Sequence, residues 1–129
     1  MDTIALMRSI LELEDWQLLI DHLADDVVFK VTIGEGTPIS PELRGKQAVA
    51  GHLMNLGDLL EFRQEVPLEY FADGDRVVVL GQETYKIKQT GKAVSGSEYA
   101  DVVDFRNGLI SRFLIIQDLS AFVDAYRAS

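Results

Sequence analysis

The sequence contains no cysteine, which excludes a disulfide framework, a thiolate nucleophile and a cysteine-ligated zinc site. Basic residues are scarce as well, with 12 lysines and arginines against 21 aspartates and glutamates and a formal net charge of −9. Binding to a nucleic-acid backbone requires clustered basic side chains, so we expect no nucleic-acid partner. No apolar run approaches the roughly 18 residues of a membrane helix, and the N-terminus lacks the basic stretch of a signal peptide. We therefore expect a cytoplasmic protein with no membrane partner.

What the chain does contain is enough apolar material for a folded core. Hydrophobic residues make up 47% of the 129 residues and charged residues 26%, a composition that argues against intrinsic disorder. At roughly 100–200 residues per domain, this length predicts one domain that spans residues 1–129. Most of the acidic side chains are expected on exposed faces, where they serve solubility.

The hydrophobic periodicity changes along the chain from a helical spacing to strand alternation. Three helices are predicted in the first half, around one early strand and a loop, and a series of long strands fills the second half. A short C-terminal helix is predicted at residues 119–126. The predicted helices cover residues 3–13, a short segment after Asp15, and 46–56; the strands cover 27–33, 61–71, 76–89, 93–106 and 109–117; the loop covers 34–41.

This order of elements predicts an α+β fold in which helices pack on one face of a strongly curved antiparallel sheet. Pro67 is expected at a bulge or at an edge of the sheet, because proline cannot donate to a ladder. Asn107-Gly108 is the strongest hairpin signal in the sequence. A curved sheet wrapped around helices leaves a cone-shaped cavity, and such cavities commonly hold small apolar ligands.

Two carboxylates fall on faces of the strands that are otherwise apolar. Asp101 alternates in phase with Tyr99, Val103 and Phe105, and Glu83 alternates in phase with apolar residues of the 76–89 strand. A carboxylate in a dry site costs several kcal/mol unless it is paired or neutralised, and such a group can serve as a hydrogen-bond donor or general acid. A bulge would turn either residue outward, and whether the two carboxylates meet is left open.

Other side chains complete the candidate site. His52 lies beside an inward-facing leucine on the third helix and is either a proton carrier or a partly exposed helix residue. No histidine spacing suits a metal, so we expect neither a metal nor a cofactor. Tyr85 and Tyr99 are the better ligand candidates, because a buried hydroxyl needs a partner, whereas most of the other aromatic and aliphatic candidates are better explained as core. The candidate ligand-binding residues are Trp16, Phe29, Val31, Leu53, Tyr85, Tyr99, Val103, Phe113, Ile115 and Gln117.

The opposite face of the last two strands is also apolar. Leu114 and Ile116 share this outer face with Ala100 and Val102 of the neighbouring strand. An apolar outer face of a sheet predicts self-association, and we expect a homodimer formed through this face.

Four segments of the sequence resemble a known superfamily. They are Asp15-Trp16 between the first helices, residues 24–29 (ADDVVF), residues 43–49 (LRGKQAV) and residues 99–110 (YADVVDFRNGLI). Together they resemble the nuclear transport factor 2-like superfamily, in its SnoaL-like and ketosteroid isomerase-like branch. The resemblance implies a cystatin-like, cone-shaped fold over nearly the whole chain and homodimers formed through the sheet. It does not imply one reaction, because the superfamily includes isomerases, cyclases, hydrolases, dehydratases and non-catalytic binders.

Only some of the superfamily's catalytic groups have a counterpart in this sequence. In ketosteroid isomerase a carboxylate base works with a tyrosine and a protonated aspartate. The resemblance places Asp101 at the protonated aspartate, but it places Val31 at the base and Met7 nearest to the tyrosine. In SnoaL-like cyclases an acid lies at or near Gln117. Epoxide hydrolases of the superfamily hold a water with an aspartate–arginine–aspartate arrangement, and alternation predicts no arginine between two acids on the inner face.

Two functions follow as hypotheses. The first is an enzyme acting on a small, mostly apolar carbonyl or cyclic molecule, of isomerase, cyclase or hydratase type. In it Asp101 is the acid or hydrogen-bond donor, Glu83 or His52 accepts a proton, and Tyr85, Tyr99 and Gln117 orient the substrate. The second is a binding protein of the same fold without chemistry, as the residues at Val31 and Met7 suggest.

Overall fold

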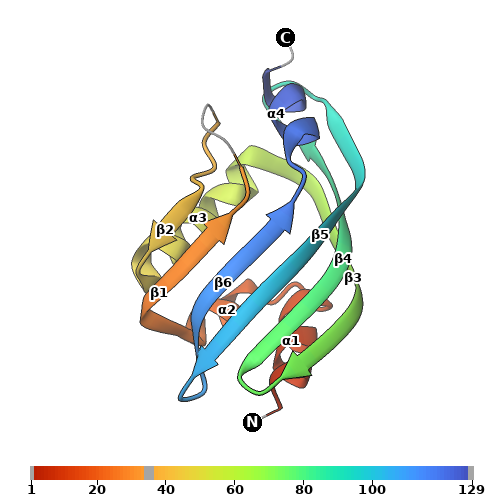
Figure 1. Ribbon diagram of the computed structural model, residues 1–129. Helices are drawn as coiled ribbons and strands as arrows, with labels where there is room; N and C mark the ends of the chain where they lie inside the picture. Colours follow the sequence, from red (N-terminus) through yellow and green to blue (C-terminus); the bar gives the residue numbers. More distant parts are fainter. Residues whose placement is uncertain (1, 34–36, 128–129) are drawn as a thin grey trace.

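The computed structural model describes residues 2–33 and 37–127, so residues 34–36 of the predicted loop lie outside the described part (Figure 1). The order of elements agrees with the sequence prediction, except for the short strand β2, which had not been predicted. The helices are α1 (Thr3–Leu11), α2 (Trp16–Asp21), α3 (Lys46–Leu59) and α4 (Ser120–Arg127); the strands are β1 (Leu23–Val31), β2 (Glu42–Arg44), β3 (Leu60–Asp73), β4 (Arg76–Ile87), β5 (Ala93–Arg106) and β6 (Leu109–Gln117).

Two aspartates begin the first two helices. Asp2 Oδ1 accepts a hydrogen bond from the Ala5 amide at 3.0 Å, and Asp15 Oδ1 accepts one from the Leu18 amide at 3.0 Å. Each carboxylate satisfies an amide that the first helical turn leaves unpaired. Glu14, with φ of 52°, reverses the chain between the helices. The predicted helix start at Asp15 is therefore confirmed.

The strands form one sheet in the order β2-β1-β6-β5-β4-β3. β3 to β6 make the expected antiparallel meander, but β1 runs parallel to β6, so the prediction of an entirely antiparallel sheet was wrong. A parallel pair requires a long crossover connection, and the chain supplies one because it passes through α3 and four further strands, β2 to β5, between β1 and β6. Alternation within a single strand carries no information about the direction of its neighbour.

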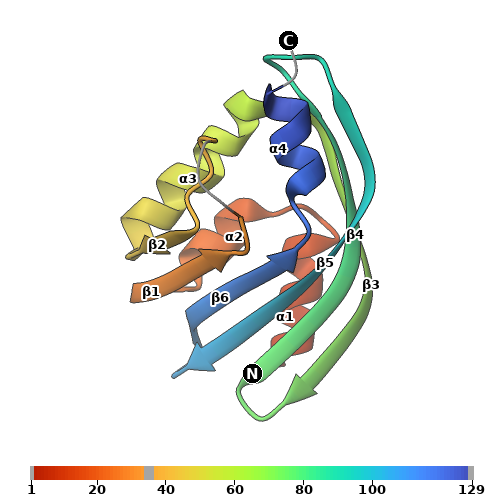
Figure 2. The same ribbon diagram turned by 45° about the horizontal axis from the view of Figure 1, so that its top comes forward.

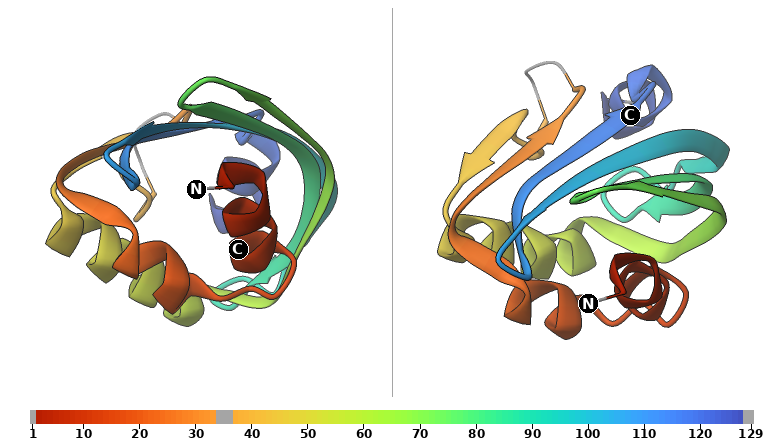
Figure 3. Two further views of the ribbon diagram at one scale, coloured as in Figure 1. Left: turned by 90° about the horizontal axis from the view of Figure 1, so that it is seen from below. Right: turned by 60° about the horizontal axis from the view of Figure 1, so that its bottom comes forward.

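The sheet curves around the helices and encloses the core (Figures 2 and 3). Figure 3 shows the strands wrapped around α1, with α2 and α3 closing the open side. The core between these layers includes side chains that are 0% exposed from both helices and strands, among them Met7, Val49, Val79 and Val103. No helix among the described residues is both long and apolar enough to cross a membrane.

Bulges bend the strands and fix which side chains point inward. The β3–β4 register shifts between Pro67 and Glu69, and β3 is the edge strand, which confirms both expectations for Pro67. A second shift in β3 lies between Glu61 and Gln64. In the β4–β5 pair, the extra residue lies in β5, at positions 95–96, before Tyr99. The alternation of β4 and of the later part of β5 therefore survives, and the predicted inner faces of both strands are buried.

Candidate functional site

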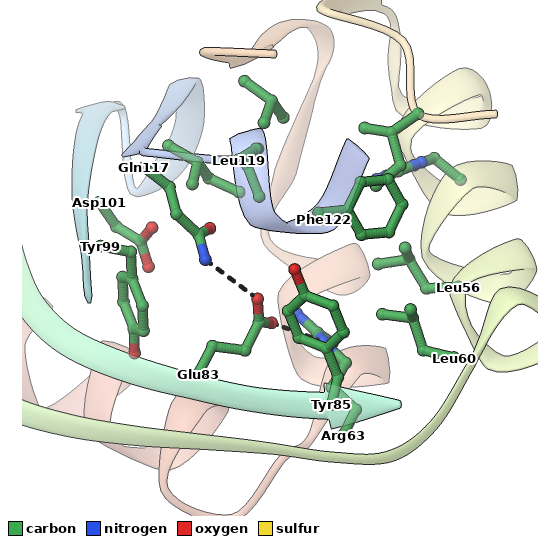
Figure 4. Close-up of a pocket in the computed structure, with 14 residues that line it drawn as sticks. Leu56, Leu60, Arg63, Glu83, Tyr85, Tyr99, Asp101, Gln117, Leu119 and Phe122 are labelled. Atoms are coloured by element: carbon green, nitrogen blue, oxygen red, sulfur yellow. Dashed lines mark hydrogen bonds and ion pairs between the residues drawn. The ribbon is translucent and has the colours of Figure 1, made fainter. Parts of the chain in front are cut away.

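A cavity of about 60 Å³ lies between the concave face of the sheet, the C-terminal half of α3 and helix α4 (Figure 4). Its wall is mostly apolar, and a small number of polar side chains enter it from β3 to β6 and from α3. Such a mixture is usual for sites that bind small molecules. The lining residues are Val31, Ile39, His52, Leu56, Leu60, Arg63, Glu83, Tyr85, Tyr99, Asp101, Ile115, Gln117, Leu119 and Phe122.

Glu83 is held by side chains of two other strands in this cavity. Its side chain comes from the inner face of β4, and the residue is 9% exposed. Oε2 accepts a hydrogen bond from Arg63 Nε at 2.8 Å, and Oε1 accepts one from Gln117 Nε2 at 3.3 Å. Gln117 Nε2 also donates to Ser97 Oγ at 3.0 Å. The arginine and the amide compensate for the burial of the carboxylate and fix its orientation.

Arg63 was missed by the sequence analysis, which predicted no arginine between two acids on the inner face; the structure places Arg63 in the same cavity as Glu83 and Asp101. Strict alternation from Glu61 would turn Arg63 outward, but the bulge between Glu61 and Gln64 inserts an extra residue and turns it inward. Its guanidinium carbon lies 4.9 Å from the centre of the Trp16 ring, within the range of a cation–π contact. Arg63 therefore connects α2 to the Glu83 carboxylate.

Asp101 points inward from β5, as the alternation predicts, and is 4% exposed. It lines the cavity from the strand adjacent to that of Glu83 (Figure 4). The two carboxylates therefore share one cavity with Arg63 and Gln117. This arrangement brings together acids, a cation and an amide around an apolar space, which is suited to proton transfer or to orienting a polarised ligand.

A second, smaller cavity of about 40 Å³ adjoins the first and shares His52, Leu56, Arg63, Asp101 and Ile115 with it. The predicted ligand-binding residues divide between the two. Val103, by contrast, is 0% exposed and lines neither cavity. The first cavity contains Val31, Tyr85, Tyr99, Ile115 and Gln117; the second contains Trp16, Phe29, Leu53, Phe113 and Ile115.

His52 lies in the wall between the two cavities. Burial, and then the positive charge of Arg63, lower the pKa of His52 below its usual value of 6.5. Its ring centre lies 5.7 Å from that of Phe29. The imidazole is therefore neutral at neutral pH. The role of proton carrier, one of the two alternatives that the sequence offers for His52, stays a prediction.

Two tyrosines reach the first cavity from neighbouring strands. Tyr85 is 2% exposed and Tyr99 is 6% exposed. Burial, and then the charge of Glu83, raise the pKa of the Tyr85 hydroxyl, so this group stays protonated. Tyr99 packs against Gly81, where a β-carbon would lie 2.5 Å from the Tyr99 hydroxyl oxygen. Glycine at this position therefore makes room for the Tyr99 ring.

Helix α4 and the residue just before it contribute two apolar side chains that the sequence analysis did not assign to the cavity. Leu119 and Phe122 line it, and the Phe122 ring centre lies 5.8 Å from that of Tyr85. The helical spacing of Leu119, Phe122 and Tyr126 marks one apolar stripe, which is a usable signal for packing. It does not reveal what the stripe packs on.

Comparison with known proteins gives a family and a fold. The SnoaL-like domain model matches residues 5–113. No curated protein matches the sequence. An NTF2-like protein of unknown function from Burkholderia pseudomallei K96243 is 19% identical with a TM-score of 0.84, and 97% of each chain is covered. TerC, co-crystallised with polyporic acid, is 21% identical with a TM-score of 0.77 over 97% of this chain and 95% of that one.

A candidate SnoaL-like polyketide cyclase from Mesorhizobium loti is 16% identical with a TM-score of 0.75, over 87% of this chain and 92% of its own. At these identities the structural matches establish the fold alone, and the family match covers most of the chain. The chain belongs to the SnoaL-like domain family of the nuclear transport factor 2-like superfamily.

Proposed function

We propose that this protein is an enzyme that moves a proton on a small, mostly apolar carbonyl or cyclic molecule, with Glu83 as the proton acceptor. The observation that carries the proposal is the Glu83 carboxylate, buried in an apolar cavity with both oxygens oriented by Arg63 and Gln117. A carboxylate held in fixed geometry beside an apolar space is well placed to take a proton from a molecule bound there.

The proposed step is balanced without any further reactant. Glu83 removes a proton from a carbon next to the carbonyl group, and the electron pair of the broken C–H bond forms the enolate, with the negative charge on oxygen. Arg63 keeps its positive charge while Glu83 becomes neutral, so it stabilises the enolate electrostatically. Asp101 is the hydrogen-bond donor or acid, and the proton returns from Glu83 to the same or another carbon.

Structural neighbours support a small organic ligand but not a particular reaction. TerC was crystallised with polyporic acid, and the Mesorhizobium loti protein carries a polyketide cyclase name. Both share the fold at 16–21% identity. The Glu83 site, rather than the fold, therefore carries the proposed reaction, because one fold supports many chemistries.

The test is exchange of carbon-bound hydrogen for deuterium. Cyclic ketones are incubated with the protein in D₂O, and loss of the proton signals next to the carbonyl is followed by NMR. We expect Glu83→Gln to slow the protein-dependent exchange by about 100-fold or more. Asp101→Asn should slow it as well, and His52→Gln should leave most of it intact. The exposed Glu98 of the same sheet provides the matched control Glu98→Gln. Exchange that is unchanged in Glu83→Gln would overturn the assignment of the base.

A binding protein without chemistry is the second candidate. It is favoured by the two positions that the superfamily resemblance assigns to catalysis: Val31 lines the cavity but cannot take a proton, and Met7 is 0% exposed in the core. Tight binding of a small apolar molecule without any exchange would favour this function over the enzyme. The single Trp16, which lines the second cavity, is a convenient fluorescent reporter of binding.

We also propose that the outer face of the sheet forms a homodimer. The register aligns Val78, Val102 and Leu114 in one row across β4, β5 and β6, next to a second row of Leu80, Ala100 and Ile116. Leu80 is 37% and Ile116 48% exposed. Sedimentation should give a dimer for the wild type and a monomer for Leu114→Lys. Leu13→Lys, at a residue 76% exposed after α1, is the control. A Leu114→Lys variant that still sediments as a dimer excludes this face.

A further inference from the structure

We propose that Tyr85, together with helix α4, forms a subsite that holds the acceptor oxygen of a flat apolar ring, so that the ligands of this cavity are cyclic carbonyl compounds. This inference deepens the proposed function because it names the ligand class of the same site. It concerns recognition rather than the removal of the proton.

The first observation is the Tyr85 hydroxyl. It is buried at the cavity wall, and among the described residues no side chain or backbone group lies within hydrogen-bonding distance of it. A buried hydroxyl without a partner is unfavourable, and native proteins rarely retain one without a reason. Figure 4 shows the Tyr85 oxygen pointing into the cavity, near Phe122. A ligand with an acceptor atom at this point would supply the missing partner.

The second observation is the kind of wall that surrounds this hydroxyl. Leu119, Phe122, Leu56 and Leu60 line the same cavity and offer only apolar surface. The Phe122 ring is inclined at 58° to that of Tyr85. This wall favours a flat apolar body, while the hydroxyl selects one polar atom on its edge. Leu119 and Phe122 also lie outside residues 5–113, which the family model matches.

The third observation decides which polar atom the subsite accepts. The raised pKa of Tyr85 keeps its hydroxyl protonated, so it donates a hydrogen bond and favours an oxygen acceptor over a donor. Glu83 lies two residues earlier on the same face of β4, about 7 Å along the strand. A ring whose carbonyl oxygen meets Tyr85 therefore extends toward the carboxylate.

The experiment compares two probes of matched shape, cyclohexanone and methylenecyclohexane, which differ in a C=O and a C=CH₂ group. Binding to the full-length protein is titrated by ligand-observed NMR. We expect wild-type protein to bind the ketone about tenfold more tightly than the alkene. Tyr85→Phe should bind the two probes equally. The control Tyr126→Phe, on α4 but outside the cavity lining, should keep the preference.

Two further measurements separate recognition from folding. Tyr85→Phe removes a buried hydroxyl without a partner, so the variant should unfold at a higher urea concentration than wild type although it binds the ketone less well. Phe122→Leu should weaken the binding of both probes to the same degree, because it reduces the apolar wall without changing the Tyr85 hydroxyl that donates the hydrogen bond. A Tyr85→Phe protein that is less stable than wild type would identify the hydroxyl as structural and overturn the subsite.

The remaining outcomes are equally decisive. Failure of wild type to bind the ketone, equal binding of both probes by wild type, or a preference that persists in Tyr85→Phe each overturns the proposal. A preference for the ketone without deuterium exchange overturns only the proposed catalysis. Exchange at Glu83 without a preference that depends on Tyr85 overturns only the subsite.

Discussion

The two faces of strands β4 to β6 differ in which kind of residue is the minority and in how exposed that minority is. On the inner face the minority is polar: Glu83, Asp101 and Gln117 are each less than 10% exposed. On the outer face the minority is apolar, and Leu80 and Ile116 remain substantially exposed. Glu83 is hydrogen-bonded to both Gln117 and Arg63, whereas Leu80 and Ile116 on the outer face stay exposed in the described chain.

This difference separates two kinds of function on one sheet. Retaining charge in a dry interior destabilises a protein unless the charge is compensated, so Glu83 and Arg63 point to a role in ligand chemistry. Leaving apolar side chains in water costs less but favours association, so the outer rows point to a partner surface. Equivalent changes on the inner and outer faces should therefore have different effects on stability.

Breaking one ion pair on each face should give the largest difference in the loss of unfolding free energy. Arg63→Met leaves the Glu83 carboxylate without its cation in a buried setting, and we expect a loss of about 3 kcal/mol in unfolding free energy. Arg76→Met breaks the pair with Asp104, whose arginine side chain is 54% exposed, and should cost less than about 1 kcal/mol. Urea denaturation measures both. Equal losses would show that the inner pair is screened as effectively as the outer one.

Adding one methyl group on the inner face should have the next largest effect. In Gly81→Ala the new β-carbon meets the Tyr99 hydroxyl at 2.5 Å and the Val66 carbonyl oxygen at 2.9 Å, which should destabilise the protein by about 2 kcal/mol. The control is Gly51→Ala in α3, where a β-carbon meets nothing within 4 Å and should stabilise the helix by up to about 1 kcal/mol. A lower melting temperature for Gly81→Ala together with a higher one for Gly51→Ala would support the close packing of Tyr99. A neutral Gly81→Ala contradicts it.

The smallest effect is expected from the pH dependence of His52. Because its pKa is lowered in the folded protein, the unfolded chain binds the proton more readily. The stabilisation is therefore fully present above the unfolded pKa of about 6.5 and is lost as the pH falls toward the folded value. Urea unfolding between pH 8 and pH 5 should show that the unfolding free energy falls more steeply toward acid pH for wild type than for His52→Gln. Parallel curves would place His52 in contact with water.

Much of the fold and part of the site follow from residue patterns. The alternation of apolar side chains predicted the inward positions of Glu83 and Asp101, since a period of two assigns every second residue to one face. Asp15 predicted the start of α2, because a side-chain cap acts within one helical turn. These features depend on neighbours that are only a few residues away.

Arg63 was not predictable in the same way. Its inward direction depends on an extra residue in β3, which becomes visible only when β3 is paired with β4. The parallel pairing of β1 with β6 and the placement of Phe122 over Tyr85 likewise join segments that are distant in the chain. No local pattern encodes such contacts, because they arise when the whole sheet closes around its helices.

The sequence by itself determined the cysteine-free, acidic composition, the order of helices and strands, and the two inward carboxylates, all of which depend on short-range periodicity. Only the tertiary structure decided that Glu83 meets Arg63 and Gln117, and that the Tyr85 hydroxyl has no hydrogen-bond partner among the described residues. The physical reason is that burial and hydrogen bonding depend on which residues lie nearby in three dimensions. A strand pattern predicts the face on which a side chain lies, but not the residues that surround it there.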